Sequence, residues 1–281
     1  MRLGFHISIA GGFNNVVHRA VERKCETVQL FTRNPRGWQY RPLDSEDINI
    51  FKKDVISHDI RPVCVHLPYL INLASAQKTL YQRSLAALVE DLHRSAMINA
   101  SFLIMHVGSA QDTYKGLKRI SDGINMALAR VSNKVMLLLE NTAGSGNELG
   151  SDFAQLKTIL DGVTGATRTG ICLDTAHAFA AGYDLRGPAQ ISHTLNAFDQ
   201  TIGLHRLHLI HLNDTKAEYG SHKDRHWHIA QGKIGDGMHH LLHHPALKHL
   251  PFIMETPRTG LKEDIKNMKK VKRLLATHPI G

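Results

Sequence analysis

Six short apolar segments of this chain each end on a residue whose side chain can bind a metal ion. These residues are His66, His106, Glu140, Asp174, His211 and Glu255. Short apolar runs bounded by turn residues are typical of buried β-strands. If the strands are parallel, their carboxyl ends share one rim, and six ligands that are far apart in the sequence converge there. The pattern therefore predicts a metal-dependent active site.

Three further side chains extend this set. His177 follows Asp174 in an Asp-x-x-His sequence just past the strand, so the two can point at neighbouring metals. Asp224 and His226 form Asp-x-His in a long loop, where one intervening residue puts both side chains on the same side. Clustered carboxylates would raise one another's pKa values unless cations were present.

The nine ligand-type side chains, four acidic and five histidine, are too many for one tetrahedral zinc ion. They suit a cluster of two or three metals with a bridging carboxylate. Imidazole combined with carboxylate favours zinc, with manganese or iron as alternatives.

Strand-like and helix-like segments alternate along the whole chain and would position these ligands. The expected strands are 3–8, 27–32, 62–67, 102–107, 135–140, 170–174, 207–212 and 252–256. Helical spacing appears at 14–24, 45–57, 77–97, 114–131, 152–160, 188–202, 237–244 and 261–275. About eight βα units predict an α/β protein, a (β/α)8 TIM barrel, with residues 1–281 as a single domain. Long loops at 33–42, 142–150 and 213–236 each follow a strand, on the catalytic face of such a barrel.

Charge and composition narrow the class of partner. The net charge of +9 and the pI near 9.5 favour an anionic partner, with nucleic acid first. The chain lacks an apolar stretch of about 18 residues, so we expect no transmembrane helix and no membrane partner. Three cysteines, Cys25, Cys64 and Cys172, argue against a disulfide framework. These features predict a cytoplasmic protein, and since nothing resembles an interface helix, a monomer.

The chain resembles endonuclease IV, the zinc-dependent apurinic/apyrimidinic endonuclease family, over essentially all 281 residues. The motifs that carry the resemblance are residues 66–72 (HLPYLIN), 140–146 (ENTAGSG), 174–184 (DTAHAFAAGYD), 211–214 (HLND), 224–226 (DRH) and 255–256 (ET). Three positions depart from the family pattern: Val107 for proline, Ala176 for cysteine and Ala230 for glycine. Ala230 follows the loop that carries Asp224 and His226, and it would change the geometry of this loop if the usual glycine has a positive φ.

The resemblance implies three zinc ions per chain, with manganese possible at one position. His66, His106 and Glu140 would hold the first ion, with Glu140 bridging to the second. Asp174, His211 and Glu255 would complete the second site. His177, Asp224 and His226 would hold the third.

The resemblance also implies the reaction, which is hydrolysis of the phosphodiester 5′ to an abasic site in duplex DNA. The products are a 3′-hydroxyl and a 5′-deoxyribose phosphate, and the family also repairs blocked 3′ ends. The nucleophile would be a metal-bridging hydroxide oriented by the catalytic carboxylates of Glu140 and Glu255. Asn34, Arg36 and Tyr69 would contact the DNA, with Arg36 and Tyr69 entering it at the lesion.

Two other functions remain open. A sugar isomerase or epimerase on a related barrel would need only Glu140, Asp174, His211 and Glu255 around one Mn²⁺ or Mg²⁺ ion. It would leave the other histidines and Asp224 unexplained. A non-catalytic DNA-damage binding protein with structural zinc would instead favour a closed, cysteine-rich site.

Overall fold

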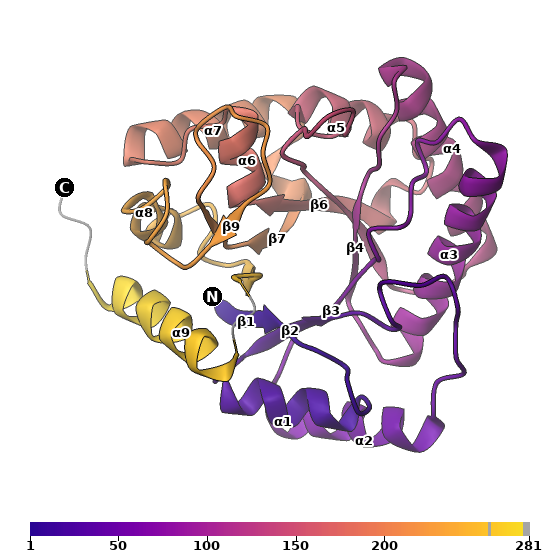
Figure 1. Cartoon of the computed structure of the whole chain (residues 1–281), viewed down its shortest axis with the longest axis horizontal. Coiled ribbons are helices and arrows are strands. Elements are labelled where there is room, and N and C mark those ends of the chain that lie inside the picture. Colours follow the sequence, from indigo (N-terminus) through magenta and orange to yellow (C-terminus); the bar gives the residue numbers. More distant parts are fainter. Residues whose placement is uncertain (258–259, 278–281) are drawn as a thin grey trace.

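The protein is an α/β barrel closed by parallel strands, as Figure 1 shows in a computed structural model that describes residues 1–257 and 260–277. Around the barrel the strand order is β1-β10-β7-β6-β5-β4-β3-β2, so the first strand pairs with the last. The barrel strands are β1 Arg2–His6, β2 Thr27–Leu30, β3 Val63–His66, β4 Phe102–His106, β5 Met136–Glu140, β6 Thr169–Asp174, β7 Leu207–His211 and β10 Pro251–Met254. The predicted TIM barrel is confirmed.

Helices surround this barrel in the order predicted. They are α1 Asn14–Glu22, α2 Ser45–Ser57, α3 Lys78–Met97, α4 Thr113–Arg130, α5 Phe153–Asp161, α7 Pro188–Thr201, α8 Gly237–His243 and α9 Leu261–Ala276. Local capping explains several starts: the carboxylate of Asp44 accepts from two backbone N–H groups of α2, and Pro188 stands at the first position of α7. Of the helices in the described residues, none is long and apolar enough to cross a membrane.

One α-helix in the described residues was not predicted. The short α6, Thr175–Ala181, starts directly after β6 because Asp174 accepts a hydrogen bond from the backbone N–H of His177 (2.8 Å) and so caps it. This cap joins the two ends of the Asp-x-x-His sequence and turns the chain sharply at the barrel mouth.

The alternation of the strands decides which side chains face the barrel axis. Six buried side chains form an apolar cluster inside the barrel: Cys64, Ile104, Leu138, Cys172, Leu209 and Ile253. Each lies two residues before one of the six strand-ending ligands. Because side chains i and i+2 share a face of a strand, the ligands point into the barrel mouth one step above this apolar layer.

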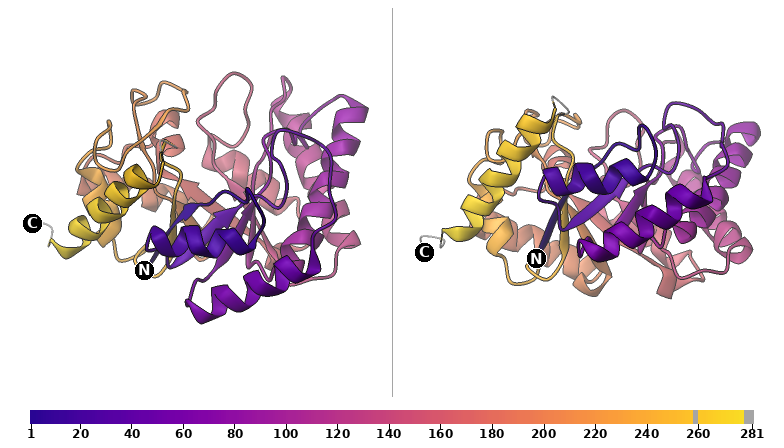
Figure 2. Two further views of the ribbon diagram at one scale, coloured as in Figure 1. Left: turned by 60° about the horizontal axis from the view of Figure 1, so that its bottom comes forward. Right: turned by 90° about the horizontal axis from the view of Figure 1, so that it is seen from below.

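The loops that follow the strands gather on one side of the barrel (Figure 2). The longest, after β7, contains two short antiparallel strands, β8 Asp214–Thr215 and β9 His226–Trp227. The buried carboxylate of Asp214 holds the far end of this loop. It accepts hydrogen bonds of 2.8–3.2 Å from the backbone N–H groups of Thr215, Gly232, Ile234 and Gly235. These bonds fix the loop that carries Asp224 and His226.

Candidate metal centre

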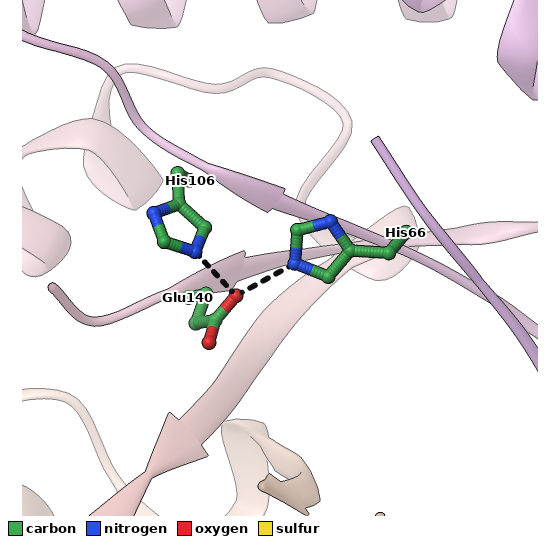
Figure 3. A group of neighbouring side chains, drawn as sticks. All are labelled: His66, His106 and Glu140. Atoms are coloured by element: carbon green, nitrogen blue, oxygen red, sulfur yellow. Dashed lines mark hydrogen bonds and ion pairs between the residues drawn. The ribbon is translucent and has the colours of Figure 1, made fainter. Parts of the chain in front are cut away.

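The first predicted ligand group forms at the ends of three adjacent strands. Nε2 of His66 on β3 and Nε2 of His106 on β4 lie 3.0 and 3.1 Å from the same oxygen, Oε2 of Glu140 on β5 (Figure 3). Glu140 is fully buried, whereas His106 is partly exposed toward the barrel mouth. Each residue offers one donor atom, and these atoms all lie within 4.8 Å of one another.

Glu140 also belongs to a second group, with Asp174, His211 and Glu255. Its other oxygen, Oε1, lies 2.8 Å from Nδ1 of His211. The same nitrogen is 3.8 Å from Asp174 and 3.4 Å from Glu255. Glu140 thus contacts both groups through different oxygens, an arrangement that suits a bridging carboxylate.

The third group differs in one member from the predicted one. The donor atoms that lie close together belong to Asp174, His177 and His226. Asp224 is at the edge of this group and half-exposed, with its carboxylate 3.5 Å from Nε2 of His177 and 3.3 Å from Nε2 of His226. Asp174 belongs to this group because its carboxylate oxygens lie 3.9 Å from Nδ1 of His177 and 3.6 Å from Nε2 of His226. The loop therefore brings Asp224 and His226 to His177, with Asp174 as an additional neighbour.

The pKa values show how strongly these groups act on one another. Burial alone would raise the pKa of Glu140, but the adjacent His211 and His106 hold it well below its usual range. Burial would likewise lower the pKa of His177, but the Asp174 carboxylate and other acidic neighbours raise it well above the usual value. Contact with His177 lowers the pKa of Asp224 to about 2 against the effect of burial.

Backbone carbonyls hold three of the imidazoles by their Nδ1 atoms. His66 lies 2.6 Å from the oxygen of Leu67 and His177 3.0 Å from that of Asn141, while His226 is 3.2 Å from the oxygen of Glu255. A carbonyl can only accept, so Nδ1 carries a hydrogen, and Nε2 is the nitrogen that faces the ligand group and that would bind a metal in the neutral ring. This is the orienting contact that metal-binding histidines usually make.

Several polar residues that position the ligands were not predicted. Asn213 donates to the Asp174 carboxylate (2.7 Å) and accepts from the backbone N–H of Glu255 (2.7 Å). Gln29 on β2 contacts both His211 and Glu255. A signal was present for each: Asn213 lies two residues after His211, and Gln29 is a polar residue inside an apolar strand.

A cavity of about 760 Å³ opens beside these groups. Its lining includes Glu255, His226 and Asp224, together with Tyr69 and Arg36 from the loops after β3 and β2. Tyr69 is 68% exposed, and its ring centre is 5.5 Å from that of His106.

Arg36 is also exposed, as is Asn34, whose side-chain oxygen accepts from the backbone N–H of Arg36 (3.0 Å). The predicted DNA-contact residues Arg36 and Tyr69 therefore share one mouth with the ligand groups, and Asn34 shapes the turn that presents Arg36.

At the position where the family pattern has glycine, Ala230 adopts φ +52°. This left-handed conformation is adopted without glycine, and the Nε2 atoms of His226 and His177 lie 3.3 Å apart. The backbone at Ala230 is therefore strained, and this strain is compatible with the contact between His226 and His177.

Comparison with known proteins identifies the family. A family model described as a xylose isomerase-like TIM barrel matches residues 17–276. The chain is 44% identical to the probable endonuclease 4 of Methanosphaerula palustris over 280 residues, which is 98% of each chain. This protein belongs to the endonuclease IV family. The resemblance inferred from the motifs is confirmed, and with it the prediction of a hydrolase of the endonuclease class.

Solved structures agree with this assignment. The endonuclease IV of Thermus thermophilus matches with a TM-score of 0.89 and 35% identity, over 98% of this chain and 99% of its own. A D-tagatose 3-epimerase-like protein matches with a TM-score of 0.73 at 14% identity, over 98% of this chain and 97% of its own. At that identity the second likeness shows a common barrel and nothing about the reaction.

Proposed function

We propose that this endonuclease IV family member incises duplex DNA on the 5′ side of abasic sites and also clears blocked 3′ ends. The products would be a 3′-hydroxyl and a 5′-deoxyribose phosphate. The observation that carries the proposal is a chain of three ligand groups at the mouth of one barrel, in which Glu140 and Asp174 each belong to two groups. We further propose one endonuclease domain over residues 1–281, acting as a monomer in the cytoplasm.

The donor set fits three zinc ions, with manganese as an alternative at one position. His66, His106 and Glu140 would hold the first ion, and Glu140 with Asp174, His211 and Glu255 the second. His177, His226 and Asp224 would hold the third. A buried cluster of carboxylates is costly without countercharge, and the fully buried Glu140 and Asp174 lie within this one.

The charge balance suits a phosphodiester substrate. Four carboxylates, on Glu140, Asp174, Asp224 and Glu255, carry less charge than three divalent ions would supply, so the loaded site would attract a phosphate. When bound, zinc ions neutralise phosphate charge and lower the pKa of a bound water to about 7.

The residues of the chain have distinct tasks around this chemistry. Glu140 and Glu255 would orient the attacking water as the catalytic carboxylates. Glu255 reaches the cavity that Tyr69 and Arg36 also line. Tyr69 and Arg36 would insert into the duplex at the lesion, where inserted side chains help a bent duplex expose its abasic nucleotide. Asn34 would contact the DNA backbone beside the lesion. A missing base makes this unstacking cheaper.

The test is incubation of the zinc-loaded protein with a duplex that contains one tetrahydrofuran abasic analogue. We expect incision on the 5′ side, and loss of incision after strong chelation. Metal analysis of the same sample should give about three ions per chain, whereas about one ion would favour a sugar isomerase. An intact duplex after incubation with folded, zinc-loaded protein would reject the proposed function.

Glu140→Gln tests the assignment of the bridging carboxylate. It should abolish incision while the protein remains folded. Glu148→Gln is the matched control, because the Glu148 side chain accepts a hydrogen bond from the backbone of Ser145 (3.0 Å) in the loop after β5. Turnover of Glu140→Gln close to that of Glu148→Gln would show that the bridging ligand is misplaced.

A further inference from the structure

Gln29 on β2 connects two members of the four-ligand group although β2 supplies none of the nine predicted ligands. Its side chain is fully buried. The amide oxygen lies 2.8 Å from Nε2 of His211, and the amide nitrogen lies 2.6 Å from Oε1 of Glu255. The same nitrogen is 3.0 Å from Nδ1 of His6 on β1.

The chemistry of these partners fixes the orientation of the amide. A carboxylate can only accept, so the NH2 group of Gln29 must face Glu255, and the amide oxygen must face His211. Because this oxygen has no hydrogen to donate, Nε2 of His211 carries the hydrogen of that bond. In the metal-free chain Nδ1 in turn donates to the Glu140 carboxylate (2.8 Å), and this is the hydrogen that a metal would displace, so Nδ1 is the nitrogen that His211 would offer as a ligand.

That nitrogen is also the one directed at the other ligands of the group. Nδ1 of His211 lies 2.8 Å from Glu140, 3.4 Å from Glu255 and 3.8 Å from Asp174. Glu255 approaches it with Oε2, while Oε1 is held by Gln29. Gln29 thus determines which nitrogen of His211 faces the group, and it holds the oxygen of Glu255 that does not face His211.

We propose that Gln29 is a positioning residue that sets the affinity of the metal held by Glu140, Asp174, His211 and Glu255. It keeps His211 in the tautomer that presents Nδ1 and keeps Oε2 of Glu255 turned into the site. The proposal rests on the proposed function in assuming that this group holds a metal. Partners of this kind typically change metal affinity by about 10–100-fold when they are removed.

Packing alone does not require an amide at this position. Burying an amide costs free energy unless its hydrogen bonds are made, and the strand interior is otherwise filled by apolar side chains such as Leu138 and Ile104. A comparison lies two residues earlier on the same strand. Thr27 is also fully buried, but its hydroxyl donates to the backbone oxygen of Pro62 (2.5 Å).

The experiment measures metal affinity in Gln29→Met, which has a similar volume without the amide. Zinc-loaded protein is titrated with a competing chelator, and the visible absorption of the cobalt-substituted protein is recorded in parallel. We expect Gln29→Met to release about one metal per chain at a chelator concentration about 10–100-fold lower than the wild type requires, and to retain the remaining metals. The spectrum of its cobalt-substituted form should also differ from that of the wild type. Thr27→Val is the matched control and should release its metals as the wild type does.

Gln29→Glu separates the two contacts and guards against a Gln29→Met protein that does not fold. It keeps an acceptor for His211 but loses the donor to Glu255, so its metal affinity should lie between those of the wild type and Gln29→Met. Wild-type affinity and an unchanged cobalt spectrum in Gln29→Met, or in Gln29→Glu if only that variant folds, would overturn the proposal. An equal loss of metal affinity in Thr27→Val would also overturn the proposal.

The outcome can be told apart from a failure of the proposed function. If the wild type leaves abasic DNA intact while Gln29→Met still loses one metal, the proposed reaction is wrong and the role of Gln29 stands. If the wild type incises the duplex while the variants bind all metals normally, the reaction stands and the role of Gln29 is wrong.

Discussion

The Nε2 atoms of His177 and His226 face each other at 3.3 Å. Nδ1 of each ring is directed at a backbone carbonyl and carries a hydrogen, so two neutral rings would present the lone pairs of both Nε2 atoms to one another. Such an arrangement is stable only if a proton or a cation is shared between them. The carboxylate of Asp224 lies within 3.5 Å of both nitrogens, so the pair is suited to a divalent metal.

Removal of one imidazole of this pair should therefore remove one metal. We expect His226→Ala to bind about two ions per chain instead of about three. It should lower the incision rate by about 100-fold or more, since one metal contributes several kcal/mol of charge stabilisation. Metal analysis and single-turnover incision measure the two effects. His228→Ala is the control, because that ring lies 3.0 Å from the side chain of Asn267, and a His226→Ala protein with three metals would contradict the assignment.

The strained Ala230 predicts a stabilising substitution. At φ +52° a residue with a Cβ atom costs about 1–2 kcal/mol, while glycine adds about 0.5–1 kcal/mol of chain entropy to the unfolded state. Ala230→Gly should thus raise the free energy of unfolding in urea by about 0.5–1 kcal/mol. Ala86→Gly, at an exposed position inside α3, should lower it by about 1 kcal/mol. A decrease in Ala230→Gly would mean that the packing of its methyl group outweighs the strain.

Much of the fold and of the candidate site was predictable because the side chains of a strand alternate between its two faces, and the sequence shows this spacing. Ile104 and His106, or Leu138 and Glu140, are two residues apart, so an apolar interior residue already implies which later residue faces the barrel mouth. Six predicted ligands at this spacing indicate both the barrel and the rim at which the candidate site lies.

The remaining features depend on long-range closure or on segments that are too short to show a period. Helix α6 has seven residues and β8 and β9 have two each. Gln29 meets its partners 182 and 226 residues away, so its role exists only once β2, β7 and β10 face one barrel axis. Asp174 joins His226 only because the loop after β7 folds back onto β6.

A buried network anchors the loop that carries Arg36. The carboxylate of Asp91 on α3 is fully buried, and it accepts from the hydroxyls of Thr32 (2.5 Å) and Tyr40 (3.2 Å). Nε of Arg33 lies 3.4 Å from the same carboxylate, and its guanidinium stacks over the ring of Tyr40. These contacts tie both ends of loop 33–42 to α3.

We expect Asp91→Asn to leave the Arg33 charge unpaired and to lower the free energy of unfolding by about 3 kcal/mol. Because the loosened loop presents Arg36 less well, KM for abasic DNA should rise by a larger factor than kcat falls. Asp122→Asn is the control, since its exposed pair with Lys118 on α4 is screened by solvent and should change stability little. An unchanged KM in a destabilised Asp91→Asn protein would limit the network to a structural role.

The ionisation of His177 and His211 predicts how chelation changes the pH dependence of stability. Burial opposes their charged forms, yet their acidic neighbours, and Cys172 beside His211, raise both pKa values well above the usual one. In the metal-free chain their contribution to stability is therefore fully present below about pH 6.5 and is lost as the pH rises through the folded pKa. Glu140 and Glu255 have lowered pKa values, so they stay ionised and constant over this window.

Metal binding requires neutral imidazoles, so the metal-loaded protein should gain stability over the same range. We expect the difference in free energy of unfolding between zinc-loaded and chelator-stripped protein to grow from about pH 6 to about pH 8. Urea unfolding at fixed free zinc measures this difference. His177→Gln should flatten the slope of the metal-free protein, whereas His193→Gln, at an exposed position of α7, should not. A difference that shrinks with rising pH would show that these two imidazoles are not the groups displaced by the metal.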